Sequence, residues 1–318
     1  MAGQASPARI AIIGAGRVGS SIAYASLIRG VARHIALYDL DGAKARAEVL
    51  DLSHGRQFVA AAEVVGGDDL EVCRGADVVV ITAGASQKPG QARLDLVRTN
   101  VALCRGLVPE IVRLAPKALL LLVSNPVDIL THACREISGW PEGRVFGTGT
   151  TLDTSRFRYA LAGRCEVAVP NVHAFIVGEH GDSEVPLWSS ASIAGVPVAR
   201  WLESCGRPFR EGEREEIFAS VRDAAYEVIR GKGATHYAIG LATTRVLEAI
   251  LDDEHAVLPV SAPVEGAYGL PPVTLSLPRL VSRQGAGAVA ALEVSDEERQ
   301  ALHRSAETVR RVAGSVGF

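Results

Sequence analysis

Three carboxylates and one histidine share a short segment at residues 178–186, which reads Gly-Glu-His-Gly-Asp-Ser-Glu-Val-Pro. The histidine is His180, and it follows an apolar run at residues 172–177 that predicts a strand. Imidazole titrates near neutral pH, so a histidine held rigidly at the edge of a cavity is a typical general acid or base. An incidental histidine in a surface turn would fit the same segment, and other residues must decide between the two interpretations.

A second pair of reactive side chains lies at residues 151–158, a stretch that predicts the start of a helix. Asp153 and Arg156 are three residues apart and therefore share one helix face. As a surface ion pair they would contribute little. In a functional site, Arg156 would hold a substrate carboxylate with two hydrogen bonds while Asp153 orients an imidazole. Arg158 is two residues further on and points away from Arg156, so it cannot share that role.

The N-terminal part carries a nucleotide-binding pattern. A β-branched run at residues 9–13 predicts a strand, and Gly14, Gly16 and Gly19 follow it before a helical pattern begins. In this context the glycines permit a tight turn, close approach to a pyrophosphate, and packing of helix on strand. The helix N-terminus adds N–H donors for the phosphates.

An acidic residue completes this pattern. Asp39 ends the strand predicted at residues 34–38, twenty residues after Gly19. A carboxylate there accepts hydrogen bonds from a ribose 2′-hydroxyl and repels a 2′-phosphate, which favours NAD over NADP. Asp41 is the alternative candidate, and either side chain could instead be a helix N-cap.

Strands and helices alternate through the first half of the chain. Further strands are predicted at residues 63–65, 77–82, 118–123 and 144–146, and the clearest helix at 94–114. This alternation predicts an α/β fold, a Rossmann-type doubly wound parallel sheet over residues 1–146. The mixed pattern of residues 147–318 predicts an α+β substrate domain, with the active cleft between the two.

Two loops should reach the ligand edge of the sheet, beyond the carboxyl ends of the strands. Residues 83–93 contain two glycines, a proline and few apolar anchors, which is typical of a mobile lid. Asn125 follows the strand at 118–123 and can offer an amide to a substrate oxygen. Asn-Pro is also a common turn without function, so Asn125 alone decides nothing.

The bulk composition excludes several classes of protein. The 318 residues are 48% hydrophobic and 22% charged, as in ordinary soluble domains, and the formal charge of −3 argues against a nucleic-acid partner. Five scattered cysteines without a C-x-x-C pair indicate reduced thiols in a cytoplasmic setting and no metal site. No apolar run is long enough to cross a membrane.

Together these motifs carry a family resemblance from about Arg9 to the C-terminus. They are Gly14-x-Gly16-x-x-Gly19, Gln87-Lys88-Pro89-Gly90 with Arg93, Ser124-Asn125-Pro126-Val127-Asp128, Leu152-Asp153-Thr154-Ser155-Arg156-Phe157-Arg158, and Gly178-Glu179-His180-Gly181-Asp182-Ser183-Glu184. The motifs occur in this order in the L-lactate dehydrogenase branch of the lactate/malate dehydrogenase family. The chain therefore resembles that branch, especially its bacterial members.

The resemblance implies a role for each matching residue. His180 would be the acid/base, with Asp153 holding its tautomer, Arg156 binding the substrate carboxylate, and Arg93 on the lid polarising the ketone together with Asn125. Thr235 would line the substrate pocket. The residues implied to contact NAD are Gly14, Gly16, Val18, Gly19, Asp39, Lys44, Gly84, Ala85, Val123, Ser124, Asn125, Thr148 and Ile239.

The family divides on one lid position, where its malate enzymes place an arginine. Here that position holds the neutral Gln87, so oxaloacetate would bury an unpaired carboxylate and pyruvate would not. The resemblance therefore implies reversible conversion of L-lactate and NAD to pyruvate and NADH, a reaction of glycolysis and fermentation. Malate dehydrogenase, another 2-hydroxyacid dehydrogenase, and a non-catalytic NAD-binding protein are the alternatives.

The resemblance also implies regulation. Bacterial relatives activated by fructose 1,6-bisphosphate bind its phosphates between subunits of a homotetramer, through residues matching Arg158 and His173. A surface arginine and an ordinary strand histidine are the plainer interpretation of these two. Three positions depart from the family pattern: Gln91 and Ala92 put the rate of lid closure in doubt, and Gly106 the affinity for NAD.

Overall fold

The computed structural model describes residues 8–85 and 93–318, apart from the side chain of Arg93. Gln87, Gln91 and Ala92 lie outside the described residues, as does the Arg93 side chain. The expectations for these four positions therefore remain predictions.

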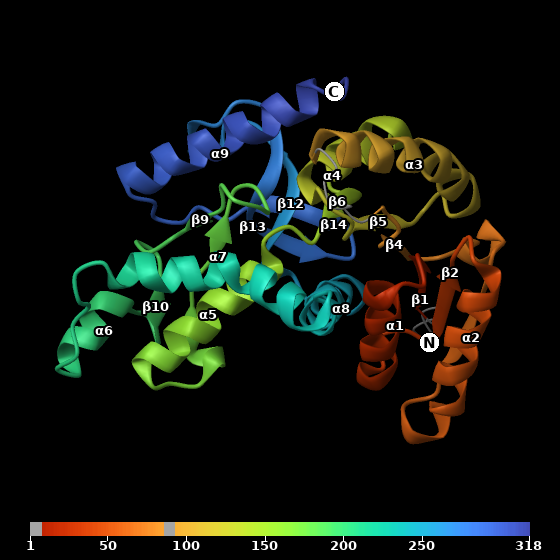
Figure 1. Ribbon diagram of the computed structural model, residues 1–318, viewed down its shortest axis with the longest axis horizontal. Helices are drawn as coiled ribbons and strands as arrows, with labels where there is room; N and C mark the ends of the chain where they lie inside the picture. The colour runs from red at the N-terminus through yellow and green to blue at the C-terminus, as the bar shows by residue number, and fades with distance from the viewer. Residues whose placement is uncertain (1–7, 86–92) are drawn as a thin grey trace, which may run out of the picture.

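Six parallel strands form the first part of the main sheet, as predicted (Figure 1). They are β1 (Arg9–Ile13), β2 (His34–Tyr38), β3 (Glu63–Gly67), β4 (Val78–Ile81), β5 (Leu119–Leu122) and β6 (Val145–Gly147). Their spatial order, β3-β2-β1-β4-β5-β6, is that of a Rossmann fold. The predicted fold class is confirmed.

The second half of the chain extends this sheet. Strands β12 (Ala256–Val264), β13 (Val273–Ser282) and β14 (Gly285–Val289) are antiparallel and join it next to β6, giving nine strands. The pairing between β12 and β6 is short and consists of Ser261 opposite Gly147. The predicted boundary after residue 146 therefore falls inside β6, in a sheet that both halves share.

Helices cover both faces of the sheet, since its strands alternate their apolar side chains between two buried layers. Ile10, Ile12 and Leu37 pack toward one layer, and Ala11 and Ile13 toward the other. The helices are α1 (Arg17–Arg29), α2 (Gly42–His54), α3 (Arg93–Leu114), α4 (Val127–Ser138), α5 (Thr151–Cys165), α6 (Val198–Ser204), α7 (Glu213–Lys232), α8 (Tyr237–Leu251) and α9 (Asp296–Gly314). A third core lies beneath α5, α6 and α7.

One predicted strand is divided in two. Instead of one strand over residues 172–177, β7 (Val172–His173) pairs with β10 (Ser192–Ile193), and β8 (Ile176–Val177) pairs with β9 (Val185–Pro186). The Ile176 N–H donates to the Thr154 hydroxyl of α5 at 2.9 Å, so a side chain replaces a neighbouring strand there. Between β7 and β8 the chain passes from one sheet to another. This places His180 next to Asp153, in the first turn of α5.

Candidate active site

The glycine loop between β1 and α1 forms the cofactor end of the site. Gly14 adopts φ +107°, which strains any residue with a Cβ atom. A Cβ on Gly19 would lie 1.8 Å from the carbonyl oxygen of Gly14, so the third glycine is required for the loop to close on the helix. Gly16 is the N-cap of α1 and faces open space toward the Lys44 amine.

Asp39 is bonded to this loop. Its Oδ2 accepts the Ala15 N–H at 2.8 Å and lies 3.3 Å from Lys44 Nζ. Burial opposes ionisation, but the backbone N–H groups of Asp41 and Ala15 and the Lys44 amine outweigh it and lower the pKa of Asp39. The alternative candidate, Asp41, is the N-cap of α2, where Oδ1 accepts the Lys44 N–H at 3.1 Å. Asp39 is therefore the carboxylate that faces the glycine loop.

A cavity of about 480 Å³ opens above this loop. Of the predicted NAD contacts it is lined by Gly14, Gly16, Asp39, Lys44, Gly84 and Ala85, and Gly106 lies on its far wall. The cavity has a glycine floor, an anionic residue at one end and a lysine beside it, so the residues present fit a dinucleotide.

The remaining predicted cofactor residues do not line this cavity. Ser124 and Thr148 are buried, and their hydroxyls donate to the carbonyls of Ala83 at 2.7 Å and Leu122 at 3.4 Å. Both side chains thus hold the ends of β4 and β5 in place. Val18 and Val123 pack against the core on the α1 face of the sheet, Gly19 is buried, and Ile239 is half-buried on α8.

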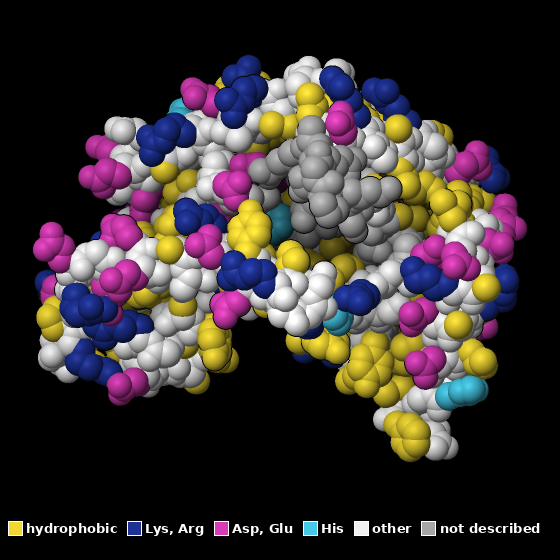
Figure 2. Space-filling view, in the orientation of Figure 1, with side chains coloured by type: hydrophobic (Ala, Val, Ile, Leu, Met, Phe, Trp, Pro, Cys, Tyr) yellow, Lys and Arg dark blue, Asp and Glu magenta, His cyan; other side chains and the backbone are white. Residues whose placement is uncertain are grey.

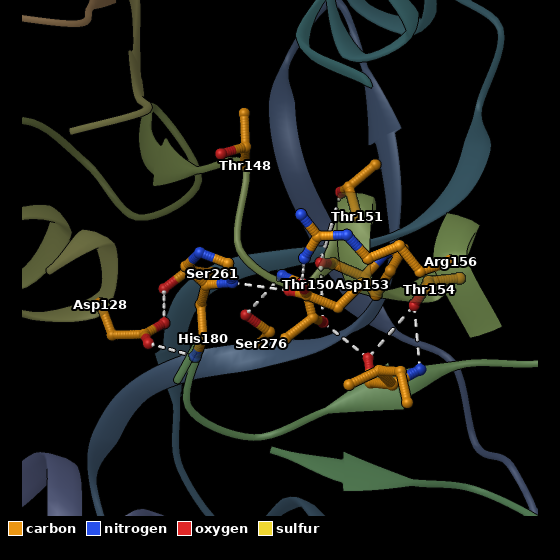
Figure 3. A network of polar contacts seen from close by, with 12 residues as sticks. Asp128, Thr148, Thr150, Thr151, Asp153, Thr154, Arg156, His180, Ser261 and Ser276 are labelled. Carbon is orange, nitrogen blue, oxygen red and sulfur yellow. Dashed lines mark hydrogen bonds and ion pairs between the residues drawn. The ribbon is translucent and has the colours of Figure 1, made fainter. Parts of the chain in front are cut away.

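His180, Asp153 and Arg156 meet in one hydrogen-bonded chain (Figure 3). His180 Nδ1 lies 2.6 Å from Asp153 Oδ2, and Arg156 Nη1 donates to Asp153 Oδ1 at 2.8 Å. The Asp153 side chain is 4% exposed and the His180 side chain 26% exposed. The imidazole therefore keeps a solvent-facing side while its carboxylate partner is buried, so Asp153 and Arg156 do not form a surface ion pair.

The charges of this group are strongly coupled. Burial alone would lower the pKa of His180, but the charge and hydrogen bond of Asp153 overcome it and raise that pKa to about 9. Burial would likewise raise the pKa of Asp153, yet His180 and Arg156 lower it. The arrangement stabilises an imidazolium paired with an ionised carboxylate.

Asp128 is a member of the site that motif reasoning quoted without assigning a role. It is 2% exposed, Oδ2 accepts the backbone N–H of His180 at 2.8 Å, and Oδ1 accepts the Ser261 hydroxyl at 2.5 Å (Figure 3). Burial raises its pKa to about 6, against the opposing effect of Ser261 and His180. The sequence signal that could have identified it is a carboxylate in the first turn of the helix that follows Asn125.

The turn that carries His180 is also fixed by Gly178. This glycine has φ +90° and bonds Ser276 of β13 in both directions, at 2.8 and 2.9 Å. A Cβ at position 178 would lie 2.6 Å from Ser305 Oγ of α9, so a side chain cannot be placed there. The imidazole is therefore held by α4, α5, β13 and α9 together.

Asn125 is held by a second residue that was missed. The buried Asn100 of α3 donates to the Asn125 carbonyl at 2.8 Å and accepts the Ala85 N–H at 2.8 Å. Asn100 thus links the lid's first residues, the cofactor cavity and Asn125 at the substrate end.

A cavity of about 270 Å³ lies beside the imidazole. It brings together the predicted residues Asn125, Asp153, Arg156 and His180, but not Thr235, which is half-buried in the turn between α7 and α8. Residues lining it that had no predicted role are Leu96, Asp182, Glu184, Arg222 and Tyr226. The cavity therefore offers a guanidinium, an amide and an acid/base within one small volume.

The pair predicted to bind a bisphosphate lies elsewhere. Arg158 stacks 4.9 Å above the Phe175 ring, and its Nε donates to the Ala174 carbonyl at 2.9 Å. It lines a separate cavity of about 420 Å³ together with Arg245. His173 is exposed on β7 and does not line that cavity, although it directly precedes Ala174.

Metal binding and membrane insertion would each need a feature within residues 8–85 and 93–318. Within this part of the chain no His, Cys, Asp and Glu side chains cluster as a metal site would require. No described helix is both long and apolar enough to cross a membrane. All five cysteines are free thiols.

Both halves of the chain match the same family of known proteins. Residues 8–147 match the family described as lactate/malate dehydrogenase, NAD binding domain, and residues 150–314 match its alpha/beta C-terminal domain. The chain is 48% identical to an L-lactate dehydrogenase of Bifidobacterium animalis subsp. lactis (strain AD011), covering 98% of each chain. An L-lactate dehydrogenase of Synechococcus sp. (strain JA-3-3Ab) is also 48% identical, over 96% of this chain and 98% of its own.

A solved structure shares the fold. The minor L-lactate dehydrogenase from Enterococcus mundtii, in a ligands-bound form, matches with a TM-score of 0.94 at 41% identity, over 98% of this chain and 99% of that one. With an NAD-binding domain and a full-length match, the chain belongs to the lactate/malate dehydrogenase family of NAD-dependent oxidoreductases.

Proposed function

We propose that this protein is an L-lactate dehydrogenase that interconverts L-lactate and pyruvate. The observation that carries the proposal is the cavity in which Asp153-paired His180 stands beside Arg156. A 2-hydroxy acid needs a group for its carboxylate and a base for its hydroxyl, and Arg156 and His180 are those two groups.

NAD bound in the glycine-floored cavity would supply the hydride acceptor for lactate oxidation and, as NADH, the donor for pyruvate reduction. The chain itself moves the proton. Neutral His180 accepts the proton of the lactate hydroxyl, and the imidazolium returns it to the forming alkoxide in the reverse direction. Asp153 stabilises the charged imidazole through the 2.6 Å contact at Nδ1 and so leaves Nε2 for the substrate.

The other polar groups hold the substrate. Arg156 uses Nη1 for Asp153, which leaves its remaining N–H groups for a substrate carboxylate. Asn125 and, from the lid, Arg93 would polarise the ketone oxygen where negative charge develops. Thr235, Val18, Gly19, Val123, Ser124, Thr148 and Ile239 keep their implied roles as substrate or cofactor contacts in this proposal.

Substrate choice rests on Gln87. A neutral side chain there leaves the second carboxylate of oxaloacetate without a cationic partner, so pyruvate is preferred. The test is NADH oxidation with pyruvate against oxaloacetate, for wild type and Gln87→Arg. The substitution should move the ratio of kcat/KM values toward oxaloacetate, and an unchanged ratio contradicts the assignment.

We also propose activation by fructose 1,6-bisphosphate through Arg158 and His173, as the resemblance implies. Arg158 keeps free N–H groups in a cavity shared with Arg245, which supports an anion there. The activator should lower the half-saturating pyruvate concentration of wild type and leave Arg158→Ala unaffected. Wild type and variant responding alike contradicts this proposal.

A cytoplasmic homotetramer acting in fermentation completes the proposal. Large apolar side chains are exposed along α1 and α8, including Tyr24 at 59% and Tyr237 at 70%. With Ile28 and Leu241 they border one groove, a surface suited to a second copy. Hydrophobic side chains gather over the lower end of α1 in Figure 2. Sedimentation of the purified chain tests this, and a monomer at working concentrations contradicts it.

A further inference from the structure

Glu184 is a buried carboxyl group in the substrate cavity that the mechanism does not use. It stands immediately before β9, is 7% exposed, and lines the cavity together with Asp153, Arg156 and His180. Its Oε1 is buried and has no hydrogen-bond partner among the residues that the structure describes. Leaving a buried polar atom unpaired is unfavourable, so the position calls for an explanation.

The charges around Glu184 explain why its ionisation matters. Helix α5 contributes Asp153 and Arg156, the turn contributes His180 and Asp182, and α7 contributes Arg222 and Tyr226. Arg156 is already paired with Asp153, and Arg222 Nε with Asp223 at 3.0 Å. Arg156 Nη1 and Arg222 Nε are thus already engaged, so an ionised Glu184 would compete with Asp153 and the incoming substrate carboxylate for the cations of the cavity.

The balance of these groups places the titration of Glu184 near the working pH. Burial and the ionised Asp153 raise the pKa of Glu184 to about 8, while His180, Arg156 and Arg222 oppose the shift. Near neutral pH most of the carboxyl group is protonated, and it becomes an anion over the next pH units.

We propose that Glu184 sets the affinity of the cavity for the substrate carboxylate by acting on Arg156. Protonated, Glu184 leaves the guanidinium to the substrate and can donate its own hydrogen bond to the substrate carboxylate. Ionised, it competes with the substrate for Arg156 and repels it. This inference rests on the proposed function, because it takes a 2-oxo acid as the ligand.

The kinetic test compares the pH dependence of KM for pyruvate in wild type and Glu184→Gln. Glutamine has the shape of the protonated acid and cannot ionise. In wild type, two groups, Glu184 and His180, must carry protons for binding, so log KM should approach a slope of two above pH 9. In the variant only His180 titrates and the slope should approach one. Between pH 7 and pH 9, KM should rise about tenfold more in wild type than in the variant.

A matched control is Glu216→Gln on the exposed face of α7, where Glu216 pairs with Arg210 at 3.2 Å outside the cavity. It removes one negative charge by the same substitution and should keep the wild-type slope. NADH binding by fluorescence checks that each variant is folded. Equal slopes in wild type and Glu184→Gln, with intact NADH binding, overturn the inference.

A spectroscopic readout is independent of turnover. The infrared carbonyl stretch of a protonated carboxylic acid should be present in wild type at pH 7, disappear as pH rises through about 8, and be missing from Glu184→Gln. Spectra of wild type and variant without this difference also overturn the inference. If instead pyruvate fails to oxidise NADH in wild type at any pH, the proposed function fails, while the infrared result still reports on Glu184.

Discussion

The cofactor end and the substrate end of this molecule are built by different means. At the cofactor end the contacts are made largely by backbone in the glycine loop, and Asp39 reaches Ala15 and Lys44 within 24 residues of sequence. At the substrate end every contact of His180 comes from a distant segment: Asp153 lies 27 residues away and Asp128 lies 52. Asp128 in turn bonds Ser261, another 133 residues along the chain.

Different kinds of substitution should therefore disrupt the cofactor end and the substrate end. A backbone-built site is sensitive to added volume, because a single Cβ atom meets a carbonyl that cannot move. A site built from buried charges is sensitive to a change of charge at constant volume, because each carboxylate has fixed partners. Four substitutions test this contrast.

Removing the acid/base should have the largest effect. His180→Ala is expected to lower kcat for pyruvate reduction by roughly 10²–10⁴-fold, since it removes the group that supplies the proton to the forming alkoxide. Affinity for NADH should stay within about twofold, because the cofactor cavity does not contain His180. Steady-state kinetics and fluorescence titration measure the two. A parallel loss of NADH affinity would show that the two ends are not separable.

Asp153→Asn keeps the volume and removes the charge. The pKa of His180, now about 9, should fall because its largest stabilising partner is lost. Pyruvate reduction needs the imidazolium, so in wild type it declines as pH rises through about 9, and in the variant the decline should begin at lower pH. We expect kcat/KM at pH 7 to fall about 100-fold, roughly 2.7 kcal/mol of transition-state stabilisation. A pH–rate profile checks this, and an unshifted profile contradicts it.

Gly19→Ala tests added volume at the cofactor end. The new Cβ would lie 1.8 Å from the Gly14 carbonyl oxygen, and relief requires moving the loop off α1. The free energy of unfolding should fall by roughly 1–3 kcal/mol, with weaker NADH binding. The matched control is Gly106→Ala, which lines the same cavity but has no atom within 4 Å of a new Cβ. Urea unfolding of both variants measures the difference, and equal losses contradict the close-approach argument.

Asp128→Asn should have the smallest effect of the four. It removes a charge that raises the pKa of His180 and replaces one acceptor oxygen by an NH₂ group facing either the His180 N–H or the Ser261 hydroxyl. We expect kcat to fall about tenfold, roughly 1.4 kcal/mol, with KM for NADH unchanged. Ser261→Ala keeps the carboxylate and should lose less activity. If pyruvate reduction by Asp128→Asn declines at the same pH as in wild type, Asp128 does not act on the pKa of His180 and its role is purely structural.

The nucleotide-binding fold and its cavity could be predicted because their signals are local. The strand at residues 9–13, the three glycines and Asp39 each depend on near neighbours, and the structure places them as expected. Asp39 was preferred to Asp41 for the ribose contact on its place at the end of the strand, but either residue could also have been a helix N-cap. Only the positions of Ala15 and Lys44 separate the two.

At the substrate end, the sequence indicates the types of side chain but not which distant segments support them. The types of His180, Asp153 and Arg156 indicated acid/base chemistry on a carboxylate-bearing substrate, and the family motifs indicated which residues belong together. No local signal in the sequence indicates that β12 and β13 join the nucleotide-binding sheet and bring Ser261 and Ser276 to the turn that carries His180.

The sequence by itself determined which chemical groups this protein has and the local geometry of its glycine loop, because torsional preference and strand-helix periodicity act over a few residues. Only the tertiary structure decided that Asp128 holds the His180 backbone. It also decided that Glu184 Oε1 is buried in the cavity lined by Arg156, with no hydrogen-bond partner in the described part of the chain. Charge states and buried hydrogen bonds depend on which distant segments share one low-dielectric volume, and the fold alone decides that.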